Sequence, residues 1–136
     1  MNYTIDKTHI DQLTSEQKQK LQELYPPKIG QKIITGKTGK NYVVKEIMRD
    51  GKLYVGSFKT WPNNVFPVLT ESDLIHALSF QSIKYPHGLT INDYSNNERP
   101  LWAVSANYRH DGPRLIDALW DAFIEMVLIP DQRLEQ

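Results

Sequence analysis

The chain of 136 residues contains no cysteine. This absence excludes disulfides, thiolate metal sites and cysteine nucleophiles. It also fits a reducing environment, in which disulfides are rare. We therefore expect a cytoplasmic protein.

Long apolar runs are also absent. No run approaches the roughly 18–20 apolar residues that a membrane-spanning helix needs. The N-terminus has no positively charged stretch followed by an apolar core, so we expect no secretory signal. The sequence therefore predicts no membrane partner.

The chain has no net charge, because its 16 basic and 16 acidic residues cancel. No global field therefore attracts nucleic acid or membrane. The charges are nevertheless unevenly placed. Residues 28–59 hold eight basic and two acidic residues, net +6, whereas residues 111–136 hold two basic and six acidic, net −4. This separation suits self-association or a charged partner, and it is equally compatible with two solvated faces.

No catalytic motif is complete. Gly36-Lys37-Thr38 resembles the end of a phosphate-binding loop, but five residues separate it from Gly30 where the motif requires four. The four histidines show no ligand spacing; they are His9, His76, His87 and His110. We therefore expect no cofactor, no metal and no catalytic residue.

Two arrangements near the C-terminus keep an enzyme open as an alternative. His110 beside Asp111 has the composition of an oriented base, although such a pair also occurs as a cap and an exposed turn residue. Three carboxylates recur at helical spacing; they are Asp117, Asp121 and Glu125. Such a stripe can bind a divalent cation, or it can be the solvated side of an amphipathic helix.

The length fits a single domain over residues 1–136. Residues 1–27 read as a helical segment that opens at Thr14 or Ser15 and ends at Pro26-Pro27. Residues 28–69 read as a β zone, and residues 70–136 as helix, loop, strand and helix. The pattern predicts an α+β fold with a small, mostly antiparallel sheet and a long apolar C-terminal helix. The turn spacing is also compatible with a partial SH3-like barrel.

The β zone centres on a lysine-rich hairpin from Lys40 to Lys59. Asp50-Gly51 suits a type I′ turn. This turn would place Ile47 opposite Tyr54 and Val43 opposite Phe58. Alternation along the strands predicts one core face, made of Tyr42, Val44, Glu46, Met48, Leu53 and Val55. The other face mixes aromatic rings with cations.

Proteins bind single-stranded nucleic acid on faces of that kind, where bases stack on aromatic rings and cations follow the phosphates. The residues predicted to bind it are Lys45, Arg49, Lys52, Tyr54 and Phe58. The alternative is a sheet buried partly on both sides, whose lysines reach to water.

The last helix is apolar over most of its circumference. Leu119 and Phe123 belong to its predicted inward face, toward a sheet. Trp120, Ile124 and Leu128 form a further stripe beside that face. If the domain leaves this stripe uncovered, it is a protein interface; otherwise it is core.

These residues identify no family. The layout of the tail, with a strand, a Gly-Pro turn, an apolar helix and then a proline, resembles small bacteriophage-encoded proteins of unknown role. The leading functional hypothesis is a non-catalytic cytosolic module that binds another protein or itself through the last helix. The alternatives are a nucleic-acid-binding accessory protein that uses the hairpin, and a small enzyme with a site near His110.

Overall fold

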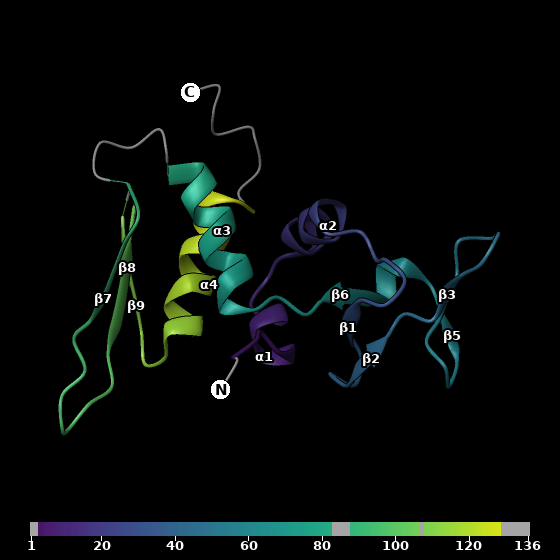
Figure 1. Ribbon diagram of the computed structural model, residues 1–136, viewed down its shortest axis with the longest axis horizontal. Helices are drawn as coiled ribbons and strands as arrows, with labels where there is room; N and C mark the ends of the chain where they lie inside the picture. The colour runs from purple at the N-terminus through teal and green to yellow at the C-terminus, as the bar shows by residue number, and fades with distance from the viewer. Residues whose placement is uncertain (1–2, 83–87, 107, 129–136) are drawn as a thin grey trace. The chain divides into compact units, whose positions relative to one another are not determined.

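The computed structural model describes residues 3–82, 88–106 and 108–128 (Figure 1). The chain forms two compact units. Asp6–Val68 is called here the N-terminal unit; Met1–Ile5 together with Leu69–Gln136 is called the C-terminal unit. Helices and small antiparallel sheets occur together, so the predicted α+β class is confirmed. The prediction of a single domain over 1–136 stays a prediction.

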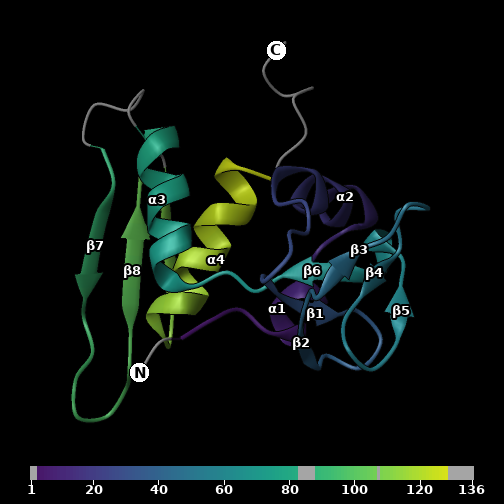
Figure 2. The ribbon, with the colours of Figure 1, turned by 45° about the vertical axis from the view of Figure 1, so that its right-hand side comes forward.

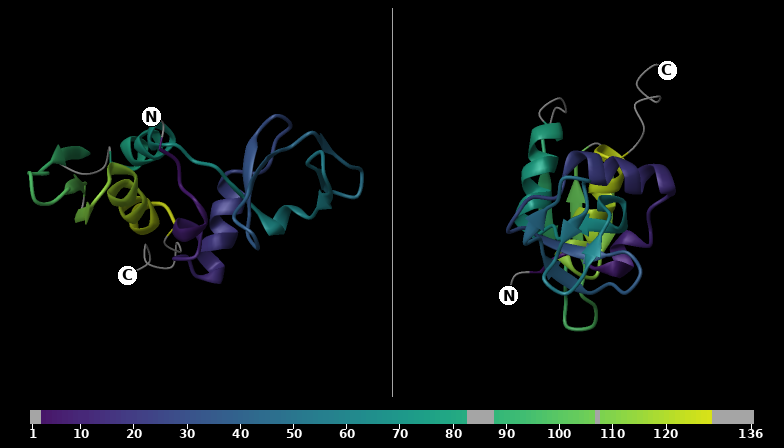
Figure 3. Two further views of the ribbon diagram at one scale, coloured as in Figure 1. Left: turned by 90° about the horizontal axis from the view of Figure 1, so that it is seen from below. Right: turned by 90° about the vertical axis from the view of Figure 1, so that its right-hand side faces the viewer.

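The N-terminal unit begins with α1 (Lys7–Ile10) and α2 (Ser15–Leu24). The side chain of Thr14 accepts a hydrogen bond from the backbone of Gln17, and the Gln17 side chain accepts one from the backbone of Thr14. This reciprocal capping box fixes the start of α2 where the sequence predicts it. The helix then packs against η1 (Pro62–Asn64) and β6 (Val65–Pro67) of the same unit (Figure 3).

Two three-stranded antiparallel sheets complete this unit (Figure 2). The first has the order β2-β1-β6, with β1 at Lys32–Thr35, β2 at Asn41–Val43 and β6 at Val65–Pro67. The second has the order β3-β4-β5, with β3 at Glu46–Ile47, β4 at Leu53–Tyr54 and β5 at Lys59–Thr60. The short 3-10 helix η1 (Pro62–Asn64) joins β5 to β6. The last strand, β6, pairs with the first, β1, as in an SH3-like barrel. The two sheets do not close into a barrel.

The core of this unit contains only part of the predicted core face of the hairpin. Five buried residues form its apolar cluster, with Tyr42 packed against them; they are Ile33, Val44, Leu53, Val55 and Val65. Glu46, which alternation assigns to the core, is exposed, and Met48 is half-buried. Both lie close to the end of the hairpin, beyond the cluster.

The predicted hairpin register is wrong by one residue. Ile47 lies opposite Leu53, and Tyr54 lies opposite Glu46. The Met48 amide donates to the Lys52 carbonyl at 2.8 Å, and the Gly51 amide donates to the Met48 carbonyl at 3.0 Å. The loop therefore contains three residues, with only Gly51 in the left-handed region at φ +93°. This is a type I turn followed by a bulge glycine, so Asp50 avoids the positive φ that a type I′ turn would impose.

The pairing of Val43 with Phe58 is also wrong. Val43 pairs with Lys32 of β1, because the long strand bends after β2 and joins the other sheet. Phe58 meets Val55 instead, whose amide donates to the Phe58 carbonyl at 3.1 Å.

The C-terminal unit is a three-stranded antiparallel sheet with two helices on one of its faces (Figures 1 and 2). The strands, in the order β7-β8-β9, are Thr90–Asp93, Trp102–Ser105 and Arg109–Gly112. The helices are α3 (Glu71–Ser82) and α4 (Leu115–Met126). Helix α4 packs against β8, β9 and α3, and Leu119 and Phe123 are fully buried, as predicted.

His110 and Asp111 do not form a turn and cap at the entry to α4. His110 to Gly112 belong to β9 rather than to a turn, and Arg114 is the residue that precedes the helix. The reason is the sheet: β9 pairs with β8 along its whole length, from Arg109 opposite Ser105 to Gly112 opposite Trp102.

Candidate nucleic-acid interface

The outward face of the sheet β3-β4-β5 carries the candidate site. Tyr54 lies between Glu46 of β3 and Lys59 of β5 in the cross-strand register. Successive side chains of a strand point to opposite faces. Because Leu53 is buried in the core, Tyr54 points to solvent, and it is 38 % exposed.

Trp61 extends this face. It follows β5 two residues after Lys59, so alternation places it on the side of Lys59 and Tyr54. Its ring is 47 % exposed. The Lys52 ammonium lies over it, 5.0 Å from the ring centroid, in a cation–π contact. The face therefore combines two open aromatic rings with two lysines.

Sequence reasoning missed Trp61. The incorrect register extended the hairpin only as far as Phe58, and Trp61 lies beyond it. The signal that would have found it is the alternation Lys52, Tyr54 on one strand and Lys59, Trp61 on the next.

The five predicted residues do not form one surface. Lys52 and Tyr54 lie on the outward face. Arg49 is exposed within the turn, and the stem of Lys45 lies along Gly56, where an added Cβ would be 3.6 Å from the Lys45 Cε atom. Phe58 turns to the edge of Tyr42, with ring centroids 5.1 Å apart, and so belongs to the rim of the core. Phe58 is nevertheless 39 % exposed, so its role in binding nucleic acid stays a prediction.

A hollow of about 610 Å³ opens beside the Trp61 ring. Its lining residues are consecutive: Trp61, Pro62, Asn63 and Asn64. The backbone here is held from two directions. The Gln22 side-chain amide of α2 donates to the carbonyls of Asn63 and Val65, both at 3.0 Å, and the Gly36 amide donates to the Asn64 carbonyl at 3.0 Å. The backbone that lines the hollow is therefore anchored to α2 and to the residue that follows β1.

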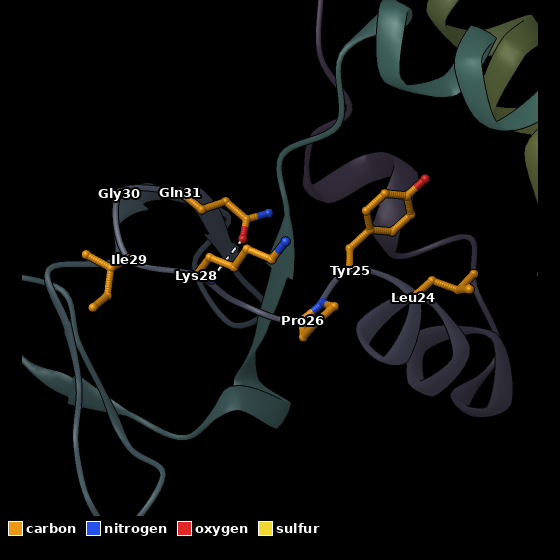
Figure 4. A pocket seen from close by; sticks show the side chains of 7 residues that line it. All are labelled: Leu24, Tyr25, Pro26, Lys28, Ile29, Gly30 and Gln31. Carbon is orange, nitrogen blue, oxygen red and sulfur yellow. Dashed lines mark hydrogen bonds between the residues drawn. The ribbon is translucent and has the colours of Figure 1, made fainter.

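A second hollow, of about 380 Å³, lies where α2 leads toward β1 (Figure 4). Leu24 and Ile29 lie at opposite ends of it in that view. Its polar groups are few: the Gln31 side-chain oxygen already accepts a hydrogen bond from the Lys28 amide at 3.0 Å. No set of polar groups converges there, so this hollow receives no assignment.

His110 is held between two carboxylates of α4. Its Nδ1 atom lies 3.2 Å from Asp121 Oδ2, and its Nε2 atom lies 2.8 Å from Glu125 Oε2. The second contact is close, but its angles are not those of a hydrogen bond. The imidazole is only 11 % exposed. Both ring nitrogens thus serve to join β9 to α4, which argues against a base that awaits a substrate.

Two other acidic residues of the unit, Asp117 and Asp111, are also engaged. Arg114 donates to both oxygens of Asp117, at 2.9 and 3.0 Å. Asp111 faces away from His110 and accepts from Arg109 Nε at 2.7 Å. This hydrogen bond and the charge of Asp111 raise the pKa of Arg109 above its usual value. Among the described residues, no group of three or more His, Asp or Glu side chains could hold a metal ion.

The stripe of the last helix is not an open patch. Trp120 and Leu128 are buried within the chain, and Ile124 is half-buried. The Trp120 ring stacks on Phe123, with centroids 5.4 Å apart. Of the two alternatives for this stripe, the burial favours the core, because α4 packs against β8, β9 and α3. An interface at Trp120, Ile124 and Leu128 stays a prediction.

The charge asymmetry follows the two units. The N-terminal unit holds eleven basic and six acidic residues, net +5, and the remaining five basic and ten acidic residues give the C-terminal unit a net −5. The outward face of β3-β4-β5 thus belongs to the positively charged N-terminal unit. Within the described ranges, no helix has the length and apolar character that crossing a membrane requires.

These residues and their geometry are the basis for a functional assignment, since comparison of the chain with protein-family models, curated proteins and solved structures gave no match.

Proposed function

We propose that the N-terminal unit binds single-stranded nucleic acid on the outward face of β3-β4-β5. One observation carries this proposal: two exposed rings, Tyr54 and Trp61, share one sheet face with Lys52 and Lys59. Open rings offer stacking surfaces to bases, and lysines neutralise phosphates. The cytosol is the proposed setting, which the lack of cysteine supports.

We expect the affinity to depend little on the base sequence of the strand, because base stacking and charge attraction supply it. Stacking of one base on an aromatic side chain contributes roughly 1–3 kcal/mol. The net charge of +5 on this unit raises the local concentration of a polyanion at low salt. A duplex hides the faces of its bases, so it would use only the lysines and would bind more weakly.

Fluorescence anisotropy with labelled single- and double-stranded oligonucleotides at low salt tests the proposal. We expect Tyr54→Ala and Trp61→Ala each to weaken single-strand binding by roughly 5- to 150-fold, the equivalent of one lost stack. The matched control is Tyr108→Ala, which removes an exposed tyrosine from the acidic unit and should leave binding unchanged.

Two results would contradict the proposed nucleic-acid binding. If the wild type retains no oligonucleotide at low salt, the proposal is wrong. Equal binding by the wild type and by a variant lacking both rings would also overturn it.

The second candidate is a non-catalytic module that binds a protein at the β3 edge of this sheet. Ile47 of β3 favours it: it lies opposite Leu53, on the other side of the strand from the Tyr54 face, yet it is 44 % exposed and adds apolar surface that a nucleic acid does not need. The oligonucleotide experiment separates the two candidates, since a protein-binding face would not distinguish single strands from duplexes.

A further inference from the structure

We infer that the hollow beside Trp61 binds one base of the strand and reads its edge through Asn63 and Asn64, with a preference for adenine. This inference rests on the proposed function and adds sequence preference to it. The ligand is an unpaired nucleobase within an oligonucleotide.

The walls of the hollow fit a planar group. The hollow is open to solvent over much of its extent and is lined by four consecutive residues, so it would hold a base against the surface without enclosing it. The Trp61 ring supplies a flat apolar surface, and Pro62 supplies a second apolar wall. A base that stacks on Trp61 would therefore have its edge close to the residues that follow Pro62.

Those residues supply hydrogen-bonding groups. Asn63 and Asn64 are both exposed, and among the described residues their side-chain amides make no hydrogen bond. Each amide offers an acceptor oxygen and two donor hydrogens. An asparagine amide can pair with N6 and N7 of adenine together, and a good bidentate pair discriminates by about 1–3 kcal/mol against the wrong base.

The backbone around these amides is already in place. The Asn64 amide donates to the Trp61 carbonyl at 3.0 Å, which closes the turn of η1. Gln22 holds the carbonyls of Asn63 and Val65 from α2. Gly36 lets β1 approach closely, since a Cβ there would lie 3.1 Å from the Phe66 ring and 3.5 Å from the Asn64 carbonyl. A site of this kind needs little reorganisation on binding.

Lys52 completes the arrangement. Its ammonium lies over one face of the Trp61 ring, 5.0 Å from the centroid, so a base would stack on the other face and the ammonium would be available to a phosphate of the strand. The stacking surface, the edge-reading amides and the cation thus come from one continuous surface of the unit.

The test uses the whole chain and thymine 12-mers that carry one central adenine, one central cytosine or no substitution. We expect the wild type to bind the adenine strand at least about 5-fold more tightly than the other two, the equivalent of one bidentate contact. A variant carrying Asn63→Ala and Asn64→Ala should lose this preference and keep its affinity for the unsubstituted strand. Asn41→Ala, an exposed asparagine of β2, is the matched control and should keep the preference.

The outcomes separate the two proposals. Equal wild-type affinity for all three strands, with binding still weakened by Tyr54→Ala, overturns the base-reading hollow and leaves the proposed function standing. An adenine preference that survives in the double asparagine variant overturns the inference as well. If no strand binds, both proposals fall.

Discussion

Gly112 approaches Ala118 so closely that a Cβ atom added to Gly112 would lie 2.8 Å from the Ala118 backbone nitrogen. The same atom would lie 2.9 Å from Cβ of Asp117. Gly112 ends β9, and Asp117 and Ala118 belong to the first turn of α4. The absence of a side chain at this position is therefore what allows α4 to begin against the sheet.

We expect Gly112→Ala to destabilise the protein by about 1–3 kcal/mol, the usual cost of forcing extra volume into a packed site. The backbone of α4 cannot yield as a flexible side chain could. Urea denaturation measures the change, with Asn92→Ala on the exposed β7 as the control. Equal stability of the Gly112 variant and the wild type would mean that α4 can shift away from β9.

The three-residue hairpin loop leads to a second prediction. Gly51 has φ +93° and nothing within 4 Å of an added Cβ, so only its backbone conformation restricts substitution. We expect Gly51→Ala to cost about 1–2 kcal/mol, and Gly51→Asn less, because asparagine tolerates the left-handed region. Denaturation of both variants provides the comparison. Equal costs for alanine and asparagine would contradict the turn assignment.

Asp6 gives a dependence of stability on pH. Partial burial alone would raise the pKa of Asp6, but hydrogen bonds from Thr8 and the charge of His9 outweigh burial and hold the pKa below its usual value. Because the folded-state pKa is depressed, the stabilisation is present above the unfolded-state value of about 3.9 and is lost as the pH falls through the folded-state value.

Asp6→Asn should therefore make stability less sensitive to acid between about pH 4 and pH 2, while it changes little near neutrality because asparagine also caps helices. Urea midpoints at several pH values would measure this. Parallel curves for the wild type and Asp6→Asn would exclude the proposed contribution.

The two carboxylates beside His110 should differ in importance. Glu125 lies 2.8 Å from the largely buried Nε2 atom, whereas the Asp121 side chain is 59 % exposed. We expect Glu125→Ala to cost about 1–3 kcal/mol, because it removes the carboxylate that lies closest to a buried ring nitrogen with no hydrogen-bond partner. Asp121→Ala should cost about 0–1 kcal/mol, as for an exposed pair. The reverse order in thermal or urea denaturation would contradict this geometry.

Salt dependence separates the roles of the rings and the lysines. For single strands, the logarithm of the binding constant falls with the logarithm of salt concentration by about 0.7 per neutralised phosphate. Lys52→Ala and Lys59→Ala should each reduce this slope by about 0.7. Tyr54→Ala should weaken binding and leave the slope unchanged. A slope that changes with Tyr54 and not with either lysine would mean that the strand lies elsewhere.

Local patterns predicted much of the fold. The capping box at Thr14 and Gln17, the β-branched strands and the apolar face of α4 identify most elements, because each depends on neighbours in the sequence. The hairpin register was not predictable in the same way. Asp-Gly is compatible with a two-residue loop and with a three-residue loop, and only the pairing of Met48 with Lys52 decides between them.

The candidate site was predicted only in part for the same reason. Moving the register by one residue separated Phe58 from Tyr54 and brought Trp61 into the surface. The sequence leaves the stripe at Trp120 open between core and interface for another reason: how many sides of a helix are covered depends on tertiary packing, which periodicity does not report.

The chain has no net charge, but its N-terminal unit is positively charged and its C-terminal unit is negatively charged. A unit of +5 and a unit of −5 should let the protein adhere to both cation- and anion-exchange resins at low ionic strength. Copies should also attract one another most strongly near the isoelectric point of about 6.9. Moderate salt screens this attraction, so the chain should dissolve better in buffered saline than in dilute buffer.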